Sequence, residues 1–181
     1  MQCFKWQVRS WRFHLKKSGF TGSVNLHASP ATHPEAVDMA SLFAGHAKKA
    51  GLKVQVKPEP ADGYWSNIWI KRPFIIGAWG GRPTADIMLS TAYKSDAKWN
   101  DTRWQREKFD SLLLQARGEL NNAKRREMYR ELQSMIRDDG GACITYFSNQ
   151  VDAGKSNVKG FVAGNFELSG MRAPERCWLD A

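Results

Sequence analysis

Apolar residues alternate with polar ones in two short stretches of the chain, residues 23–28 and 52–57. A period of two predicts a β-strand with one buried face in each stretch. Between the stretches, apolar residues recur every three or four positions over residues 36–47, which predicts a helix that ends at Gly51. A strand, a helix and a strand this close together form a βαβ crossover with parallel strands. The pattern therefore predicts an α/β fold.

Other stretches predict further elements with less regular patterns. Helical spacing over residues 9–18 predicts a short helix. The apolar run 73–79 predicts a strand that is buried on both faces. The second half has two apolar helical stripes joined near Asn121, and then a run typical of a strand at residues 142–151. Residues 155–181 carry large apolar side chains without a clear period, so these residues need a surface to pack on.

The composition is that of one globular domain with one sizeable core, since 42% of the 181 residues are hydrophobic. The net charge is +9, which raises the question of a nucleic-acid partner. Much of this charge lies in residues 6–17 and 124–130. In the second segment Glu127 and Glu131 interleave with the arginines, so a solvated helix face is favoured over a nucleic-acid site.

Neither a leader nor a cysteine site is predicted. Residues 1–10 contain no apolar segment and no cleavage site, so the chain as written is expected to stay in the cytoplasm. Cys3, Cys143 and Cys177 are isolated, so we predict no disulfide, no metal and no cofactor. Cys143 lies in an apolar run and is predicted to be a buried, unreactive thiol.

No residue set predicts catalysis. The four histidines are scattered, and the nearest approach to a catalytic group is His27, Ser29 and His33, without a nucleophile elbow. A phosphate-binding loop is also missing from the sequence, so the chain is not an ATPase. We expect a binding protein rather than an enzyme. A basic nucleic-acid-binding module and a small α/β enzyme remain as alternatives.

Four phrases follow one another in a recognisable order: HLKKSG at 14–19, a helix from EAVD to AKKAG over 35–51, WGGRPTAD at 79–86, and AKRREMYRELQ at 123–133 with its DDGG ending. Together they resemble the family-5 extracellular solute-binding proteins, the peptide, dipeptide and nickel class of ABC importers. The resemblance extends over about residues 11–181.

The resemblance implies the C-terminal lobe of a two-lobed periplasmic-binding-protein-like fold (type II, peptide-binding class), with a mixed sheet flanked by helices. Residues 1–10 would be an unmatched extension, 11–152 the second lobe, and 153–181 a terminal segment that packs on a missing N-terminal lobe. The implied function is that of a truncated substrate-binding subunit. It would capture a peptide or related small polar solute for ABC permease subunits in the membrane, without a nucleic-acid partner. Family members are periplasmic.

The resemblance also implies a ligand-binding segment. Trp79, Gly80 and Gly81 would line the cleft at the carboxyl end of a strand, where α/β sheets bind ligands. Arg82 stands where peptide-binding members carry an acidic residue, and a guanidinium there would favour an anion. Asp86 follows. The alternative is that Arg82 is solvent-exposed and Asp86 caps a helix over residues 87–93.

Two tyrosines complete the predicted site. Tyr64 belongs with Trp65 and Trp69 to an aromatic group just before the cleft strand. Because the two tryptophans are spaced as on one helix face, core packing is favoured for this group. Tyr146, with Asn149, is a candidate for the hinge or the cleft.

Overall fold

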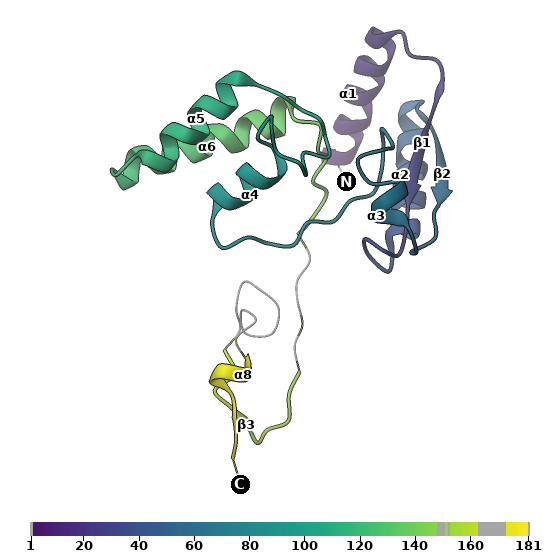
Figure 1. Cartoon of the computed structure of the whole chain (residues 1–181). Helices are drawn as coiled ribbons and strands as arrows, with labels where there is room; N and C mark the ends of the chain where they lie inside the picture. Colours follow the sequence, from purple (N-terminus) through teal and green to yellow (C-terminus); the bar gives the residue numbers. More distant parts are fainter. Residues whose placement is uncertain (1, 148–150, 152, 163–172, 181) are drawn as a thin grey trace. The chain divides into compact units, whose positions relative to one another are not determined.

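A computed structural model describes residues 2–147, 151, 153–162 and 173–180 (Figure 1). These residues form two compact units, Met1–Trp79 and Gly80–Ala181, in place of the single domain that the length predicts. The boundaries predicted at residues 10 and 152 come from the resemblance to longer proteins and stay predictions.

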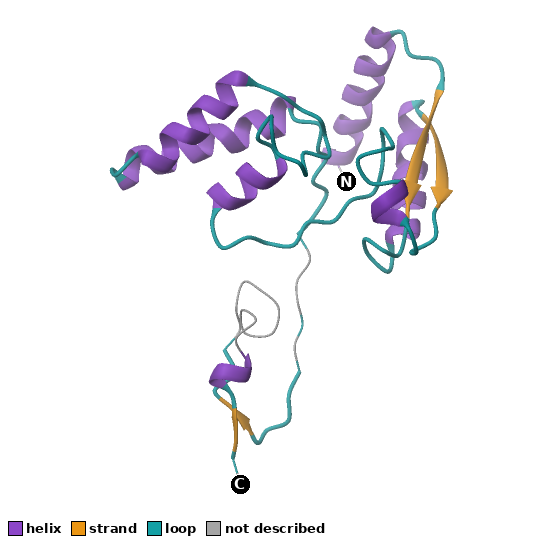
Figure 2. Cartoon of the chain, in the orientation of Figure 1, coloured by secondary structure: helices purple, strands orange, loops and turns teal. Residues whose placement is uncertain are grey.

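The first unit contains the predicted βαβ crossover (Figure 2). Strand β1 (Ser23–Ala28) and strand β2 (Lys53–Pro58) pair in parallel, with Ser23 opposite Lys53, and helix α2 (Ala36–Ala50) connects them. The alternating pattern of β1 places Leu26 and Ala28 against α2, where they are fully buried with Ala36 and Ala40. The predicted parallel pair and its helix are therefore confirmed.

Two further helices belong to this unit. Helix α1 (Gln2–Ser18) begins seven residues before the predicted start, because no proline or glycine interrupts residues 2–8. The Arg12 Nε donates to the Lys49 carbonyl at 2.9 Å, which joins α1 to the C-terminal end of α2. Helix α3 (Tyr64–Asn67) is one turn long, and Gly63 directly precedes it.

The apolar run 73–79 forms less of a strand than its pattern predicts. Only Ile75 bridges to β1, where the Ile76 amide donates to the His27 carbonyl at 2.8 Å and the His27 amide donates to Phe74 at 3.1 Å. Gly77 is exposed, so the run is not buried on both faces. Among the residues that the structure describes, no strand lies on its far side, and a strand without a second neighbour loses pairing and burial.

Gly51 allows a test of how α2 ends. It ends α2 with φ 98°, a conformation that a residue with a Cβ adopts at a cost. Gly51→Ala should therefore lower the free energy of unfolding by about 1 kcal/mol. Gly45→Ala, inside the same helix with no atom within 4 Å of the added methyl, should raise it by about 0.5–1 kcal/mol. Urea titration measures both, and equal signs would contradict the conformational explanation.

The second unit is built on three helices, α4 (Ala85–Ala92), α5 (Glu107–Gly118) and α6 (Asn122–Asp139). Helices α5 and α6 lie side by side, as the two apolar stripes predict (Figure 1). Asn121 joins them, and its side chain accepts hydrogen bonds from the first amides of α6. Nine apolar residues form the buried core in the described part of the unit: Leu89, Ala92, Tyr93, Trp104, Phe109, Leu113, Ala116, Leu132 and Ile136.

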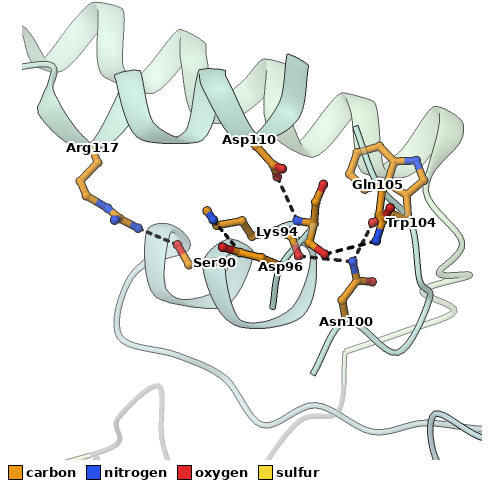
Figure 3. Close-up of polar contacts among 9 residues, drawn as sticks. Ser90, Lys94, Asp96, Asn100, Trp104, Gln105, Asp110 and Arg117 are labelled. Atoms are coloured by element: carbon orange, nitrogen blue, oxygen red, sulfur yellow. Dashed lines mark hydrogen bonds and ion pairs between the residues drawn. The ribbon is translucent and has the colours of Figure 1, made fainter. Parts of the chain in front are cut away.

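Polar side chains hold the loop between α4 and α5 (Figure 3). The buried Asn100 amide donates to the Trp104 carbonyl at 2.6 Å and to the Lys94 carbonyl at 3.3 Å. The Asp110 carboxylate accepts the Ser95 amide at 3.0 Å. The Trp104 indole, which precedes α5, donates to Asp139 at the end of α6. These bonds fix the long connection and satisfy its buried polar groups.

The C-terminal region departs most from the sequence-based expectations. Residues 142–147 and 151 form no strand, and Asn149 lies outside the described residues. Cys143 is exposed, so the prediction of a buried thiol is wrong. Strands β3 (Val158–Lys159) and β4 (Trp178–Leu179) pair antiparallel, with the short helix α8 (Ala173–Arg176) before β4. No helix in the described part of the chain is long and apolar enough to cross a bilayer.

Candidate functional site

The carboxyl ends of β1 and β2 place two polar side chains at the same edge of the sheet. His27 is near the end of β1 and Glu59 directly follows β2. The His27 Nδ1 and a Glu59 carboxylate oxygen are 2.6 Å apart, and the two side chains are only 13% and 21% exposed. This edge is where open α/β sheets bind their ligands. The pair is therefore the polar centre of the candidate site.

The residues considered for catalysis each have a separate partner. The Ser29 hydroxyl is fully buried and donates to the Pro60 carbonyl at 3.1 Å. The His33 ring pairs with Glu35 at 2.6 Å on the exposed surface. His27 is engaged by Glu59. A nucleophile and its base must share a hydrogen bond, and these side chains are instead committed elsewhere.

Aromatic rings form a row that leads to Trp79. The centroids of Tyr64 and Trp65 are 5.6 Å apart, those of Trp65 and Trp69 5.7 Å, and those of Trp69 and Trp79 6.4 Å, all edge to face. Such pairs stabilise beyond the area that they bury. The row holds Trp79 at the end of the apolar run 73–79, and Trp65 remains half exposed.

Tyr64 is the buried end of this row, with 1% of its surface exposed. Its hydroxyl donates to the Ile76 carbonyl at 2.9 Å. Burial, together with the charge of Glu59, raises the pKa of Tyr64 to about 12, so the hydroxyl keeps its proton. The favoured core packing is confirmed for Tyr64. Its predicted ligand contact stays a prediction, and its hydroxyl already has a partner.

The glycine turn after Trp79 is stabilised by Arg82. The guanidinium donates to the carbonyls of Gly80 at 2.9 Å and Gly81 at 3.1 Å. Neither glycine has a positive φ, and a Cβ at Gly80 would meet only Arg82 at 3.6 Å. The ligand contacts of Gly80, Gly81 and Arg82 stay predictions.

Asp86 connects α4 with α5 and α6. Its carboxylate accepts from Arg117 Nε at 3.1 Å and from the Tyr129 hydroxyl at 3.3 Å. Burial first, and then the charge of Asp86, raise the pKa of Tyr129. The cap of α4 is Thr84, whose side chain accepts from the Ile87 amide, so the alternative that Asp86 caps this helix is wrong. The ligand role of Asp86 stays a prediction.

Asp86→Ala tests this connection. The change leaves the Arg117 and Tyr129 side chains without their shared acceptor, and we expect the free energy of unfolding to fall by about 1 kcal/mol, because Arg117 is half exposed. Asp138→Ala removes an exposed pair with Arg137 and should leave the free energy of unfolding unchanged. Urea titration compares them. An unchanged stability for Asp86→Ala would contradict the structural role.

Two residues of the site remain, Tyr146, which was predicted from the sequence, and Glu59, which was not. Tyr146 is exposed in the strandless segment, and its cleft or hinge role stays a prediction. Glu59 was missed, although it follows β2 much as His27 ends β1, which is a readable signal in a parallel pair. Within the described ranges, no group of three His, Cys, Asp or Glu side chains could hold a metal ion.

Comparisons with known proteins identify the fold. No family model and no curated protein matches the chain. Among the solved structures that are similar to this chain are the ABC transporter substrate-binding protein CtaP from Listeria monocytogenes (TM-score 0.64, 20% identity, 74% of this chain and 28% of that one), HbpA2 from Haemophilus parasuis (0.68, 16%, 94% and 35%), and the periplasmic binding protein DppA from Helicobacter pylori with the peptide STSA (0.66, 15%, 94% and 34%).

These similarities confirm the predicted α/β fold of a periplasmic binding protein lobe. The chain spans about a third of the length of these structures. At identities of 15–20% a shared fold does not by itself carry over a function, which has to be argued from the site.

Proposed function

We propose that this chain is the solute-binding part of an ABC-type importer, and that it takes up a peptide or related small polar solute for delivery to a permease. The observation that carries the proposal is the partly buried His27–Glu59 pair at the carboxyl edge of the sheet. Similar structures are substrate-binding proteins, one of them with a bound peptide, which supports the proposal.

The chemistry of the site suits a small polar solute with an apolar part. The Glu59 carboxylate is an acceptor for an ammonium or amide group, and partial burial strengthens such a bond. His27 keeps its second ring nitrogen for a further contact, since Glu59 engages Nδ1. The aromatic row that ends at Trp79 provides an apolar wall in the same unit. Binding, rather than turnover, is what such groups can do without a nucleophile.

The experiment is calorimetric titration of the chain with a panel of short peptides, opines and sugars. Glu59→Gln should weaken the binding of the best solute about tenfold, because the amide keeps an acceptor oxygen but loses the negative charge that strengthens the hydrogen bond. Glu35→Gln is the matched control, since His33 and Glu35 form the same kind of pair at the same distance but with more exposed side chains. The affinity of this variant for the solute should be unchanged.

Two outcomes would overturn the proposal. Binding of no member of the panel by the folded chain would remove the solute role. If the two variants Glu59→Gln and Glu35→Gln bind the solute with equal affinity, the His27–Glu59 pair is not the binding site.

A further inference from the structure

Positive charge is concentrated in the first unit. Residues 1–79 carry eleven Lys and Arg against four Asp and Glu, which accounts for seven of the nine excess charges. The second unit has sixteen against fourteen and is nearly balanced. Such an asymmetry between parts of one chain indicates an anionic partner for the charged part.

Helix α1 is the most one-sided element of this unit. Its sequence contains five Lys and Arg and no Asp or Glu. In its described part, Arg9, Lys16 and Lys17 are exposed and lie four, three and four positions from Phe13. Residues at these spacings are neighbours on a helix surface. Phe13, although apolar, is 63% exposed, so a solvated aromatic ring is surrounded by three cations.

The other side of α1 rests on α2. Arg12 donates to the Lys49 carbonyl, and Leu15 reaches Gly51, where an added Cβ would be 3.7 Å from the leucine Cδ2. These contacts fix which face of α1 is turned away from the unit. Lys48 and Lys49, in the last turn of α2, are also exposed and extend the cationic surface past the contact.

We infer that this face of α1 docks on an anionic phospholipid membrane surface. Basic side chains around an exposed aromatic ring are the pattern of interfacial helices, in which the cations bind lipid phosphates and the ring enters the boundary of the acyl chains. Each cation near such a surface strengthens binding about fivefold. A helix face that is only solvated would account for the charges, but it would not account for the exposed Phe13 at their centre.

Co-sedimentation with vesicles tests the inference on the full chain. We expect binding to vesicles of phosphatidylcholine mixed with phosphatidylglycerol and no binding to phosphatidylcholine alone. The bound chain should be released in about 1 M salt, where the Debye length is only about 3 Å. The double variant Lys16→Glu, Lys17→Glu should bind more than about tenfold more weakly. Phe13→Ala should weaken binding several-fold.

The matched control is Leu42→Ala on α2. Leu42 is as exposed as Phe13, at 63%, but lies one turn from Asp38 instead of among cations, so its loss should not matter. If Leu42→Ala weakens binding as much as Phe13→Ala, or if neither vesicle type is bound, the inference is wrong. A third outcome would also overturn the inference. If the chain binds a short DNA duplex as tightly as the vesicles, and Phe13→Ala does not change vesicle binding, the surface binds polyanions in general. Solute titration is independent of these readouts.

Discussion

Phe109→Ala is expected to lower the free energy of unfolding by about 3–5 kcal/mol. The Phe109 side chain is fully buried in the second unit, on the side of α5 that belongs to the core. Its ring meets Trp104 edge to face with 5.0 Å between the centroids. Truncation removes this contact and leaves a cavity that the helices cannot close completely. Urea titration followed by tryptophan fluorescence measures the loss.

Leu114→Ala is the control on the same helix. Leu114 is half exposed, so its truncation should change the free energy of unfolding by less than about 1 kcal/mol. A similar loss for both variants would mean that α5 is not packed through Phe109.

Leu26→Ala is expected to cost about 2–5 kcal/mol in the first unit. Leu26 is 1% exposed and lies with Ala36 and Ala40 in the core between β1 and α2. Alanines on the facing helix cannot fill the space that the shorter side chain leaves. Hydrogen exchange of the β1 and β2 amides should accelerate in the variant, because opening of this pair becomes easier.

Asn25→Ala changes the neighbouring position of the same strand, whose side chain is exposed. Its exchange rates should stay close to those of the unchanged chain. Acceleration in both variants would indicate that strand propensity, and not the Leu26 core, determines the stability of β1.

The period of the apolar residues predicted the elements that bury one face and expose the other. The alternation in 23–28 and the helical stripe that ends at Gly51 correspond to β1 and α2, because each pattern is fixed by one partner surface. The apolar runs 73–79 and 142–151 also predicted strands, but the structure has only an isolated bridge at Ile75 in the first run and no strand in residues 142–147 and 151 of the second. An apolar run reports a tendency to be buried, and pairing depends on a neighbouring strand that the run itself does not specify.

The candidate site was predictable only in part. Trp79 stands out at the end of an apolar run, and the structure joins it to Trp69 in one aromatic row. Glu59 was predictable, since the expected parallel pairing brings the carboxyl ends of the two strands together and so joins Glu59 to His27 across 32 positions of the chain. Asp86 could not be assigned from sequence, because its partners Arg117 and Tyr129 follow 31 and 43 positions later.

Strand β2 has a further consequence for how the chain behaves at high concentration. Among the described residues it pairs only with β1, so its outer edge offers unpaired amides and carbonyls to another molecule. Lys53 and Lys57 are exposed along this strand and Pro58 ends it. Two like charges repel a second copy, and proline withholds a donor, so strand addition between copies is disfavoured. The same lysines thus act against aggregation into cross-β assemblies.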